Sequence, residues 1–534
     1  MKFNKTITKT LLVAAVASAT LSAGVQAKTF KWAFQGDIQS LDPYTLNETF
    51  TLGFLGNVYE GLTAYDKDFN VVPSLAVSWE NTSPTKWVFK LREGVKFHNG
   101  NVFNADDVVF SWKRSLSDGS DMKSYGTKIS NIVIVDDYTI ELETPVPNPI
   151  LPRTLTFYYM MDKEWSEANN ASKSSNAADG ASDANYANTH ANGTGPYVLK
   201  ERQPDVKTVF SRNTNYWTEL DSNVTTVEFT PISQASTRIA ALISGELDLV
   251  YPIPVQDWNR LDNTDGVHTL NGPEARTIFL GMDQYRDELL YSNVKGKNPF
   301  KDIRVRQAFA SAINLDAINK KIMRGSAKPT GILIAPQVNG YNAEIAEPYV
   351  YNPKKSKELL QEAGYANGFE VTMNCPNNRY VNDEKICQAV TSMLAKVGVK
   401  VDLLAEPKAK YFSKLLAAGD YSTSFYLLGW TPGTMDVHNV LSSIMSCRGE
   451  GSTKGQFNAG NYCNPRIAEI ADLVVEETDQ VKRKALVDEA LSTMKKEIGF
   501  IPLHQQPLSW GARDGIKLVQ RADDVLDLRT IVLP

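Results

Sequence analysis

Segments with strand-like and helix-like spacing of apolar residues follow one another along most of this chain. Residues 30–35 alternate between apolar and polar side chains, which predicts a strand, and residues 50–59 carry apolar side chains at helical spacing. Asn104 is a candidate N-cap for another helix, and Asp106 and Asp107 lie in its first turn, where the helix dipole favours carboxylates. Strands and helices are therefore expected to be mixed from the beginning of the chain.

The same alternation continues to the C-terminal third. Strands are predicted at 87–92, 193–199, 247–250, 369–374, 399–404 and 424–428, and helices at 236–244, 304–314, 354–362, 383–396 and 464–477. Glycines follow three of these helices, at the position where a left-handed residue commonly ends a helix. Residues 166–192 are rich in Ala, Asn and Ser, which predicts an exposed loop or insertion. Strands that alternate with helices are typical of βαβ units, so we expect an α/β protein with mixed sheets.

The first 27 residues have the pattern of a secretory signal peptide. Three lysines, Lys2, Lys5 and Lys9, precede an apolar run at 11–17, and Val25-Gln26-Ala27 is an acceptable cleavage site. The run is shorter than the roughly 20 apolar residues that a permanent transmembrane helix needs. We therefore expect export to the periplasm and a chain that does not span the membrane after cleavage.

Charge and composition narrow the class of partner. The chain has 56 basic and 61 acidic residues, and removal of the three lysines of residues 1–27 would change its net charge from −5 to −8. An acidic surface disfavours nucleic acid and anionic lipid as partners. A hydrophobic fraction of 42% is expected of a globular protein, and the length suits two or three domains of about 150 residues each.

Four cysteines form two pairs that are close in sequence, Cys375 with Cys387 and Cys447 with Cys463. An even number of cysteines in an oxidising compartment favours disulfides over free thiols. Three connectivities are possible, and we favour the two local pairs because each closes a short loop. A zinc site is disfavoured, because neither pair has the spacing of a zinc knuckle.

Catalytic and metal-binding motifs were sought around the five histidines, which are His98, His190, His268, His438 and His504. None belongs to an HExxH motif, and the chain has no GxSxG nucleophile elbow. A secreted hydrolase and a chaperone-like envelope protein are weaker alternatives to a binding protein. We expect a protein that is not an enzyme and has neither a cofactor nor a metal site.

Several separated motifs resemble one protein family. They are Ser40–Pro43, Asn57–Leu62, Pro73–Trp79, Trp87–Phe97, Phe103–Val108, Gly193–Tyr197, Gly245–Asp248, Val305–Ala310, Ala395–Val399 and Leu428–Trp430. In order and spread they resemble the bacterial extracellular solute-binding proteins of family 5, which serve peptide-type ABC importers and include dipeptide- and oligopeptide-binding proteins. The resemblance covers nearly all of the chain after residue 27.

This resemblance implies a large, type II-like periplasmic-binding-protein fold with two lobes and a hinge. Lobe I would comprise 28–275 plus 505–534, with an extra subdomain near 65–200, and lobe II would comprise 276–504. The lobes would close on a solute, and the closed form, a monomer, would deliver it to the permease subunits of the transporter. Di- or oligopeptides are the expected cargo. An oligosaccharide, an opine, a glutathione-like compound or a metal chelate is the alternative.

The segment after the Gly-Trp motif contains the first candidate ligand residues. In dipeptide-binding members an acidic residue of this segment pairs with the peptide amino group, but here the corresponding position is Gly433, and Asp436 matches a later one. Asp436 is therefore a candidate anchor, or alternatively the N-cap of the next helix. Trp430 and Thr431 follow a predicted strand, where ligands of α/β sheets collect. A tryptophan buried in the core is the alternative for Trp430.

Two further candidates come from other parts of the chain. Arg379 could bind a carboxylate with both arms of its guanidinium group, although a solvated surface arginine is the alternative. Glu48 could accept an ammonium group of the ligand, and Thr49 is its neighbour on the predicted cleft. An ordinary helix cap is the alternative for both residues.

Overall fold

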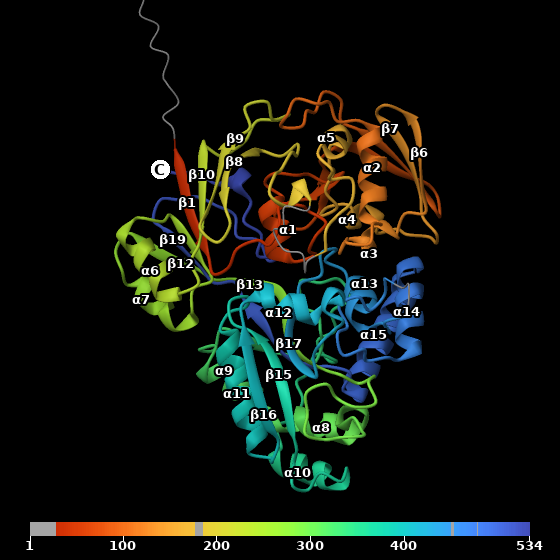
Figure 1. The fold of residues 1–534 in the computed structure, drawn as a ribbon, viewed down its shortest axis with the longest axis vertical. Helices are drawn as coiled ribbons and strands as arrows, with labels where there is room; N and C mark the ends of the chain where they lie inside the picture. Colours follow the sequence, from red (N-terminus) through yellow and green to blue (C-terminus); the bar gives the residue numbers. More distant parts are fainter. Residues whose placement is uncertain (1–27, 177–184, 450–452, 478) are drawn as a thin grey trace, which may run out of the picture.

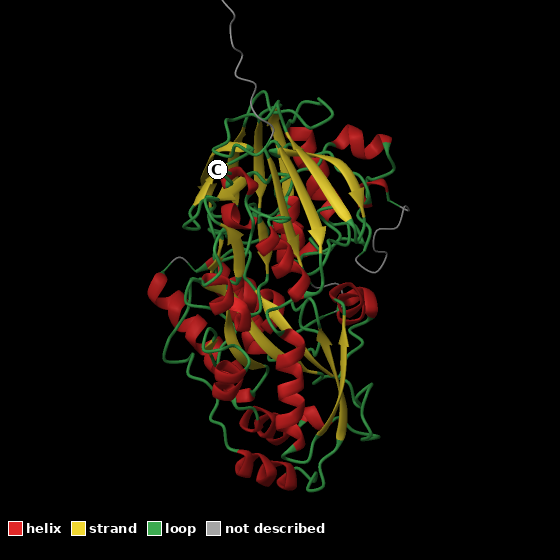
Figure 2. Ribbon diagram, turned by 90° about the vertical axis from the view of Figure 1, so that its left-hand side faces the viewer, coloured by secondary structure: helices red, strands yellow, loops and turns green. Residues whose placement is uncertain are grey.

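The structure is a computed structural model that describes residues 28–176, 185–449, 453–477 and 479–534. It has two lobes, one above the other in Figures 1 and 2. Lobe I contains a seven-stranded and a four-stranded sheet, together with the short pair β2 and β3, and lobe II contains a six-stranded sheet. The predicted signal segment, residues 1–27, lies outside the described residues.

The seven-stranded sheet of lobe I has the order β12-β19-β11-β1-β10-β9-β8. Its strands are β1 (Thr29–Phe34), β8 (Tyr197–Gln203), β9 (Lys207–Arg212), β10 (Thr226–Pro231), β11 (Leu249–Tyr251), β12 (Val267–Leu270) and β19 (Trp510–Arg513). Side chains alternate between the two faces of β1. Phe30, Trp32 and Phe34 pack in one core with α1 (Thr49–Leu55), while Ala33 contacts the core of α6 (Ala235–Ser244) and α7 (Trp258–Asp262). Figure 1 shows α6 and α7 on the side of this sheet away from α1.

The four-stranded antiparallel sheet lies at the other end of lobe I and has the order β4-β5-β7-β6. It lies within the segment expected to form an extra subdomain. Its strands are β4 (Ala76–Ser83), β5 (Lys86–Leu91), β6 (Asn131–Asp136) and β7 (Thr139–Glu143), and β2 (Thr63–Tyr65) pairs separately with β3 (Val71–Pro73). The accompanying helices are α2 (Ala105–Ser115), α3 (Lys123–Gly126), α4 (Leu151–Thr154) and α5 (Lys163–Ala168).

Lobe II is a three-layer α/β/α unit around a sheet of order β14-β18-β13-β17-β15-β16. Its strands are β13 (Pro273–Met282), β14 (Lys328–Pro329), β15 (Glu370–Pro376), β16 (Lys400–Glu406), β17 (Phe425–Trp430) and β18 (Ile501–Pro507). Period-two alternation places Ile278 and Leu280 in one core and Phe279 in the other.

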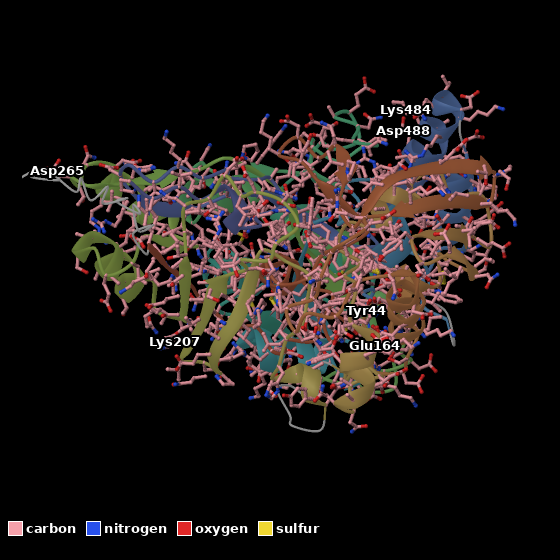
Figure 3. The ribbon with its side chains drawn as sticks, turned by 90° about the horizontal axis from the view of Figure 1, so that it is seen from above. Tyr44, Glu164, Lys207, Asp265, Lys484 and Asp488 are labelled. Carbon is pink, nitrogen blue, oxygen red and sulfur yellow. A yellow bond between two sulfur atoms is a disulfide. The ribbon has the colours of Figure 1, made fainter. Side chains whose placement is uncertain are left out.

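Helices cover both faces of this sheet, because both faces of its central strands are apolar. One face packs against α8 (Ile303–Ala312), α9 (Leu315–Lys321), α10 (Pro353–Glu362) and α11 (Asp383–Ala395). The other packs against α12 (Lys408–Leu415), α13 (Val437–Val440), α14 (Pro465–Glu476) and α15 (Gln480–Glu497). Figure 3 shows charged side chains at the periphery, including Lys484 and Asp488, which form an ion pair on α15.

The chain crosses between the lobes after β12 and returns after β18. Residues 271–272 connect the lobe I strand β12 to β13, and residues 508–509 connect β18 to the lobe I strand β19. These two neighbouring connections are the expected hinge, and they lie within a few residues of the predicted boundaries at 275 and 505. The division into domains remains a prediction from the sequence.

Most predicted elements are present with small shifts in their bounds. Asn104 caps α2 in a capping box with Asp107, and Gly245 ends α6 with φ of 79°. The predicted helix 50–59 is too long, because α1 ends at Leu55. The loop predicted at 166–192 is wrong in part, since α5 reaches Ala168 and a short helical turn occupies 186–188, while residues 177–184 lie outside the described residues.

The structure joins Cys375 to Cys387 and Cys447 to Cys463, the two local pairs favoured from the sequence. The first disulfide connects β15 to α11, and the second closes the segment between α13 and α14. Over the described ranges, no helix combines the length and the apolar character needed to cross a membrane.

Candidate functional site

A cavity of about 780 Å³ lies between the two lobes. Lobe I contributes residues 46–49, Leu52, Tyr125 and Phe157 to its lining. Lobe II contributes Arg379 and the segment around Trp430. Apolar and aromatic side chains form most of the lining. They include Leu46, Leu52, Phe157, Phe412, Leu416, Leu428, Met435 and Phe457. A few charged groups converge on these walls, which is the usual composition of a small-molecule site.

Trp430 lies at the carboxyl end of β17, where the buried strand reaches the cavity. Its indole Nε1 donates a hydrogen bond to Asn439 Oδ1 at 2.8 Å, and its ring packs against Phe457 with centroids 4.8 Å apart. These contacts fix the ring in place while leaving it partly exposed, so it combines a structural contact with a surface on the cavity. Thr431 also lines the cavity, and its buried Oγ1 has no hydrogen-bond partner among the described residues.

Glu48 connects the two lobes electrostatically. It caps α1 by accepting hydrogen bonds from Thr51 N and Thr51 Oγ1 at 3.1 and 2.6 Å, and it also lines the cavity. From lobe II, Arg379 Nε lies 2.5 Å and Lys408 Nζ 3.2 Å from its carboxylate oxygens. Figure 1 shows α1 above α12, which begins with Lys408, across the boundary between the lobes. The cap expected as an alternative role for Glu48 is therefore present together with an interlobe ion pair.

Burial and charge oppose one another at Glu48. Burial alone would raise the pKa of this carboxyl, but the positive charges of Lys408 and Arg379 and the hydrogen bond from Thr51 lower it to about 2. Glu48 is therefore ionised at neutral pH. The solvated surface position considered for Arg379 is wrong, because its side chain is 4% exposed and is held against Glu48.

A second charged group on the cavity was missed by sequence reasoning. Arg276 lines the cavity from β13, and its Nε lies 2.5 Å from Glu274 Oε1. Its buried Nη2 has no hydrogen-bond partner among the described residues, so it remains available to a ligand acceptor. Glu274 and Arg276 are charged residues at the start of a strand that is otherwise mostly apolar, and this pattern could have identified the pair from the sequence.

Asp523 and Asp524 enter the cleft from the C-terminal segment of lobe I. Asp523 lines the cavity, and both of its oxygens accept hydrogen bonds from Arg521 at 3.1 and 2.6 Å. Asp524 accepts a hydrogen bond from Trp510 Nε1 at 2.7 Å in an adjoining small cavity that Arg379 also lines. Burial and the nearby Glu274 carboxylate raise the pKa of Asp524 to about 8.

Of the other predicted ligand residues, Thr49 lines the cavity and Asp436 does not. Asp436 accepts hydrogen bonds from His438 N at 2.9 Å, as the cap of α13, and from Asn339 Nδ2 at 2.9 Å. It also pairs with Arg483 at 2.6 Å. The preceding residue Met435 has φ of 49° and itself lines the cavity, so the turn directs Asp436 into lobe II. We therefore correct the expected ligand role of Asp436 to that of a helix cap.

A group of three acidic residues, Asp107, Asp162 and Glu164, brings carboxylate oxygens within 4.8 Å of one another. Asp162 Oδ2 already accepts hydrogen bonds from three asparagine side chains, those of Asn99, Asn101 and Asn192. Both oxygens of Asp107 accept backbone N–H groups. Because these donors occupy the positions that a cation would need, the group serves as a structural hydrogen-bond centre. Figure 3 shows Glu164 toward the edge of the molecule.

The family model described as "Bacterial extracellular solute-binding proteins, family 5 Middle" matches residues 70–452. The chain belongs to this family. Among its curated relatives, the "Glutathione-binding protein GsiB" of Pectobacterium atrosepticum is 29% identical over 494 residues. This alignment covers 91% of the chain and 90% of the relative.

Two solved structures show the same fold. The periplasmic binding protein DppA from Helicobacter pylori, in complex with the peptide STSA, superposes with a TM-score of 0.84 at 24% identity and covers 95% of this chain and 98% of its own. The binding protein AgaA in complex with agropinic acid, from A. tumefaciens R10, has a TM-score of 0.82 at 21% identity, covering 95% and 99%. The family 5 assignment and the two-lobed α/β fold predicted from the sequence are thereby confirmed.

Proposed function

We propose that this protein is the periplasmic substrate-binding component of an ABC importer and that it captures short peptides between its lobes for delivery to the permease. The observation that carries the proposal is the apolar cavity between lobes I and II, on which Arg276 and Arg379 converge. A ligand that contacts both lobes binds the closed form more tightly than the open form, and this difference shifts the protein toward closure.

The charges around the cavity favour a ligand with net negative charge. Arg276, Arg379, Lys408 and Arg521 bring four positive charges to the cavity wall or the layer directly behind it. Three carboxylates, those of Glu48, Glu274 and Asp523, are each paired with one or more of these cations. Asp524 is largely protonated at neutral pH because its pKa is about 8. These four cations therefore outnumber the three carboxylates that pair with them.

These charges and apolar walls suit a small peptide with an extra carboxylate. Peptides of the glutathione type are the first choice, and the curated relative named above is a glutathione-binding protein. The second candidate is a carboxylate-bearing solute that is not a peptide, such as an opine. It is favoured by the same cations, because both acidic residues on the cavity lining are already paired and neither is left for a ligand ammonium group.

Ligand screening by thermal shift and calorimetry tests this proposal. The protein is unfolded, freed of bound ligand and refolded, then titrated with glutathione, dipeptides, longer peptides, opines, oligosaccharides and nickel chelates. A ligand at 100 times its dissociation constant stabilises the fold by about 2.7 kcal/mol, which a thermal shift detects. Solution scattering then measures whether the binding ligand makes the protein more compact.

Variants at the cavity distinguish specific capture from surface binding. Arg276→Met removes the available Nη2 group and should weaken binding at least about tenfold, because a buried charge-assisted hydrogen bond is lost. Arg466→Met is the control, since Arg466 is half exposed and pairs with Glu489 on the surface of lobe II. The proposal fails if no peptide or opine binds, or if both variants bind as the original protein does.

Export, location and assembly belong to the same proposal. Residues 1–27 would be removed as a signal peptide, and N-terminal sequencing of the protein from a periplasmic extract should then begin at Lys28. We expect a monomer, because two independent lobes must move freely about the connections at 271–272 and 508–509. An uncleaved N-terminus in the periplasmic fraction would contradict the proposed processing.

A further inference from the structure

A second cavity, of about 380 Å³, extends the interlobe space beyond Tyr125. Tyr125 lines both cavities, and the adjacent residues Gly433 and Thr434 line the first and the second respectively. A Cβ atom on Gly433 would lie 2.8 Å from the Tyr125 hydroxyl, so Tyr125 packs closely against Gly433 at the boundary between the two cavities. The two spaces are therefore neighbouring parts of one cleft.

Most of the residues that line the second cavity have polar side chains. Lobe I contributes Ser124, Lys128 and Asn148, and lobe II contributes hydroxyl, imidazole and amide groups from the segment around α13. Figure 1 shows α3, which ends just before Lys128, above α13 at the boundary between the lobes. The groups from lobe II are those of Thr434, His438, Asn439, Ser442 and Ser443.

Several polar groups of this cavity have no partner within the described residues. Lys128 is half-buried, and no carboxylate of the described chain lies within 4 Å of its ammonium group. Thr434 Oγ1 and Asn148 Oδ1 are buried without a hydrogen-bond partner in residues 28–534 as far as the structure describes them. Thr434 is 4% and Asn148 3% exposed. Burial of the Lys128 ammonium group or the Thr434 hydroxyl without a partner costs stability, and a ligand acceptor would remove that cost. Asn148 Oδ1 is itself an acceptor and needs a donor instead.

The acidic groups near Lys128 form their short ion pairs with other cations, and the charge of Asp472 only partly offsets the burial that lowers the pKa of Lys128. Asp472 pairs with Lys454 at 2.5 Å, and Asp436 pairs with Arg483 at 2.6 Å. His438 stays neutral, since burial, followed by the positive charges of Lys128 and Arg483, lowers its pKa well below its usual value. The cavity therefore presents the Lys128 ammonium group and several hydroxyl groups, which can donate hydrogen bonds to a carboxylate.

We propose that this second cavity, the Lys128 subsite, binds a carboxylate at the far end of a ligand whose body lies against Trp430 in the first cavity. The inference rests on the proposed function and extends it, because it assigns a length and a charge to the ligand. A carboxylate there accepts from the Lys128 ammonium group and the Thr434 hydroxyl. A ligand too short to pass Tyr125 leaves both groups unpaired.

Matched acid and amide ligands test the subsite. Calorimetry compares di-, tri- and tetraalanine with their C-terminal amides, and glutathione with its glycine ethyl ester, for the original protein and for Lys128→Met. We expect at least one acid to bind about tenfold or more tightly than its neutral partner, and Lys128→Met to remove most of that ratio. Lys128→Arg should retain it, and Thr434→Val should reduce it.

Lys123→Met is the charge-matched control, because Lys123 begins α3, the helix just before Lys128, pairs with Asp118 and does not line either cavity. It should leave the ratio unchanged. Thermal unfolding of each empty variant shows whether it is folded. Thr434→Val replaces an unpaired hydroxyl with a methyl group and keeps the test valid if Lys128→Met is unstable.

The outcomes separate this inference from the proposed function. If probes bind but the acid-to-neutral ratio is the same in Lys128→Met, the Lys128 subsite is wrong while ligand capture stands. If inorganic phosphate alone stabilises the original protein but not Lys128→Met, and no ligand carboxylate depends on Lys128, the cavity holds a solvent anion and the inference is overturned. If none of the probes binds the original protein, the peptide proposal and the subsite both fail.

Discussion

Substitution of Glu48 by glutamine tests whether the interlobe ion pair holds the lobes together in the empty protein. Glu48 belongs to lobe I, whereas its cationic partners Arg379 and Lys408 belong to lobe II. Glutamine keeps the size of the side chain and its cap oxygen but removes the negative charge. It leaves two cations in the closed cleft without a counter-ion, which is more unfavourable than the loss of one ion pair at the surface.

The pKa of Glu48 sets the size of the expected effect. In the closed form the pKa lies at about 2, compared with 4.5 for a carboxyl group in water, and a group in the open cleft regains solvent. This difference corresponds to about 3 kcal/mol in favour of closure, or a change of about 300-fold in the ratio of closed to open protein. The side chains involved are 3–5% exposed, so screening by solvent is weak.

Single-molecule energy transfer between one dye on each lobe measures the ratio directly. Glu48→Gln should shift the empty protein toward the open form by about 300-fold, and in the original protein the same shift should develop as the pH falls from about 4.5 toward 2. The sign follows from the lowered pKa, because the stabilisation is complete above 4.5 and is lost when Glu48 binds a proton. Glu141→Gln is the control, since Glu141 pairs with Lys86 within lobe I. If Glu48→Gln and Glu141→Gln have the same distribution of distances, the ion pair does not hold the lobes together.

Three further predictions concern the cavity, the disulfides and pH. Trp430→Ala should weaken peptide binding at least about tenfold in calorimetry. It should lower the unfolding free energy of the empty protein by less than the roughly 3–5 kcal/mol typical of a fully buried tryptophan, because the ring is partly exposed. Intact affinity with a large loss of stability would assign Trp430 to the core. Replacement of either disulfide by two serines should lower the unfolding free energy in urea by about 3 kcal/mol, since the cysteines are separated by 12 and 16 residues, and an unchanged midpoint would contradict this. The stability of the original protein should fall as the pH rises from about 4 to about 8, because the raised pKa of Asp524 lets the folded form keep a proton that the unfolded chain releases. Asp524→Asn should reduce this fall, and equal pH slopes for the two proteins would refute the assignment.

The sequence correctly predicted helices whose ends are marked by a capping residue or a terminal glycine. The capping box at Asn104 and the left-handed Gly245 act through neighbouring residues, so α2 and α6 could be located from the sequence. The strands β13 and β18 were missed as elements. They lie at the centre of the lobe II sheet and are covered by helices on both faces, so their side chains do not follow the alternation that identifies a half-exposed strand.

The sequence by itself determined the family, the α/β class, the local disulfide pairs and several cavity residues, among them Glu48, Arg379 and Trp430. It could not determine which charges meet, because Glu48 is 331 residues from Arg379 and 360 from Lys408 in the chain and contacts them only when lobes I and II pack together. For the same reason the tertiary structure alone decided that Asp436 turns into lobe II and that Arg276 and Lys128 face the cleft. Pairing between distant ionic groups depends on the lobe–lobe geometry, which no local sequence pattern encodes.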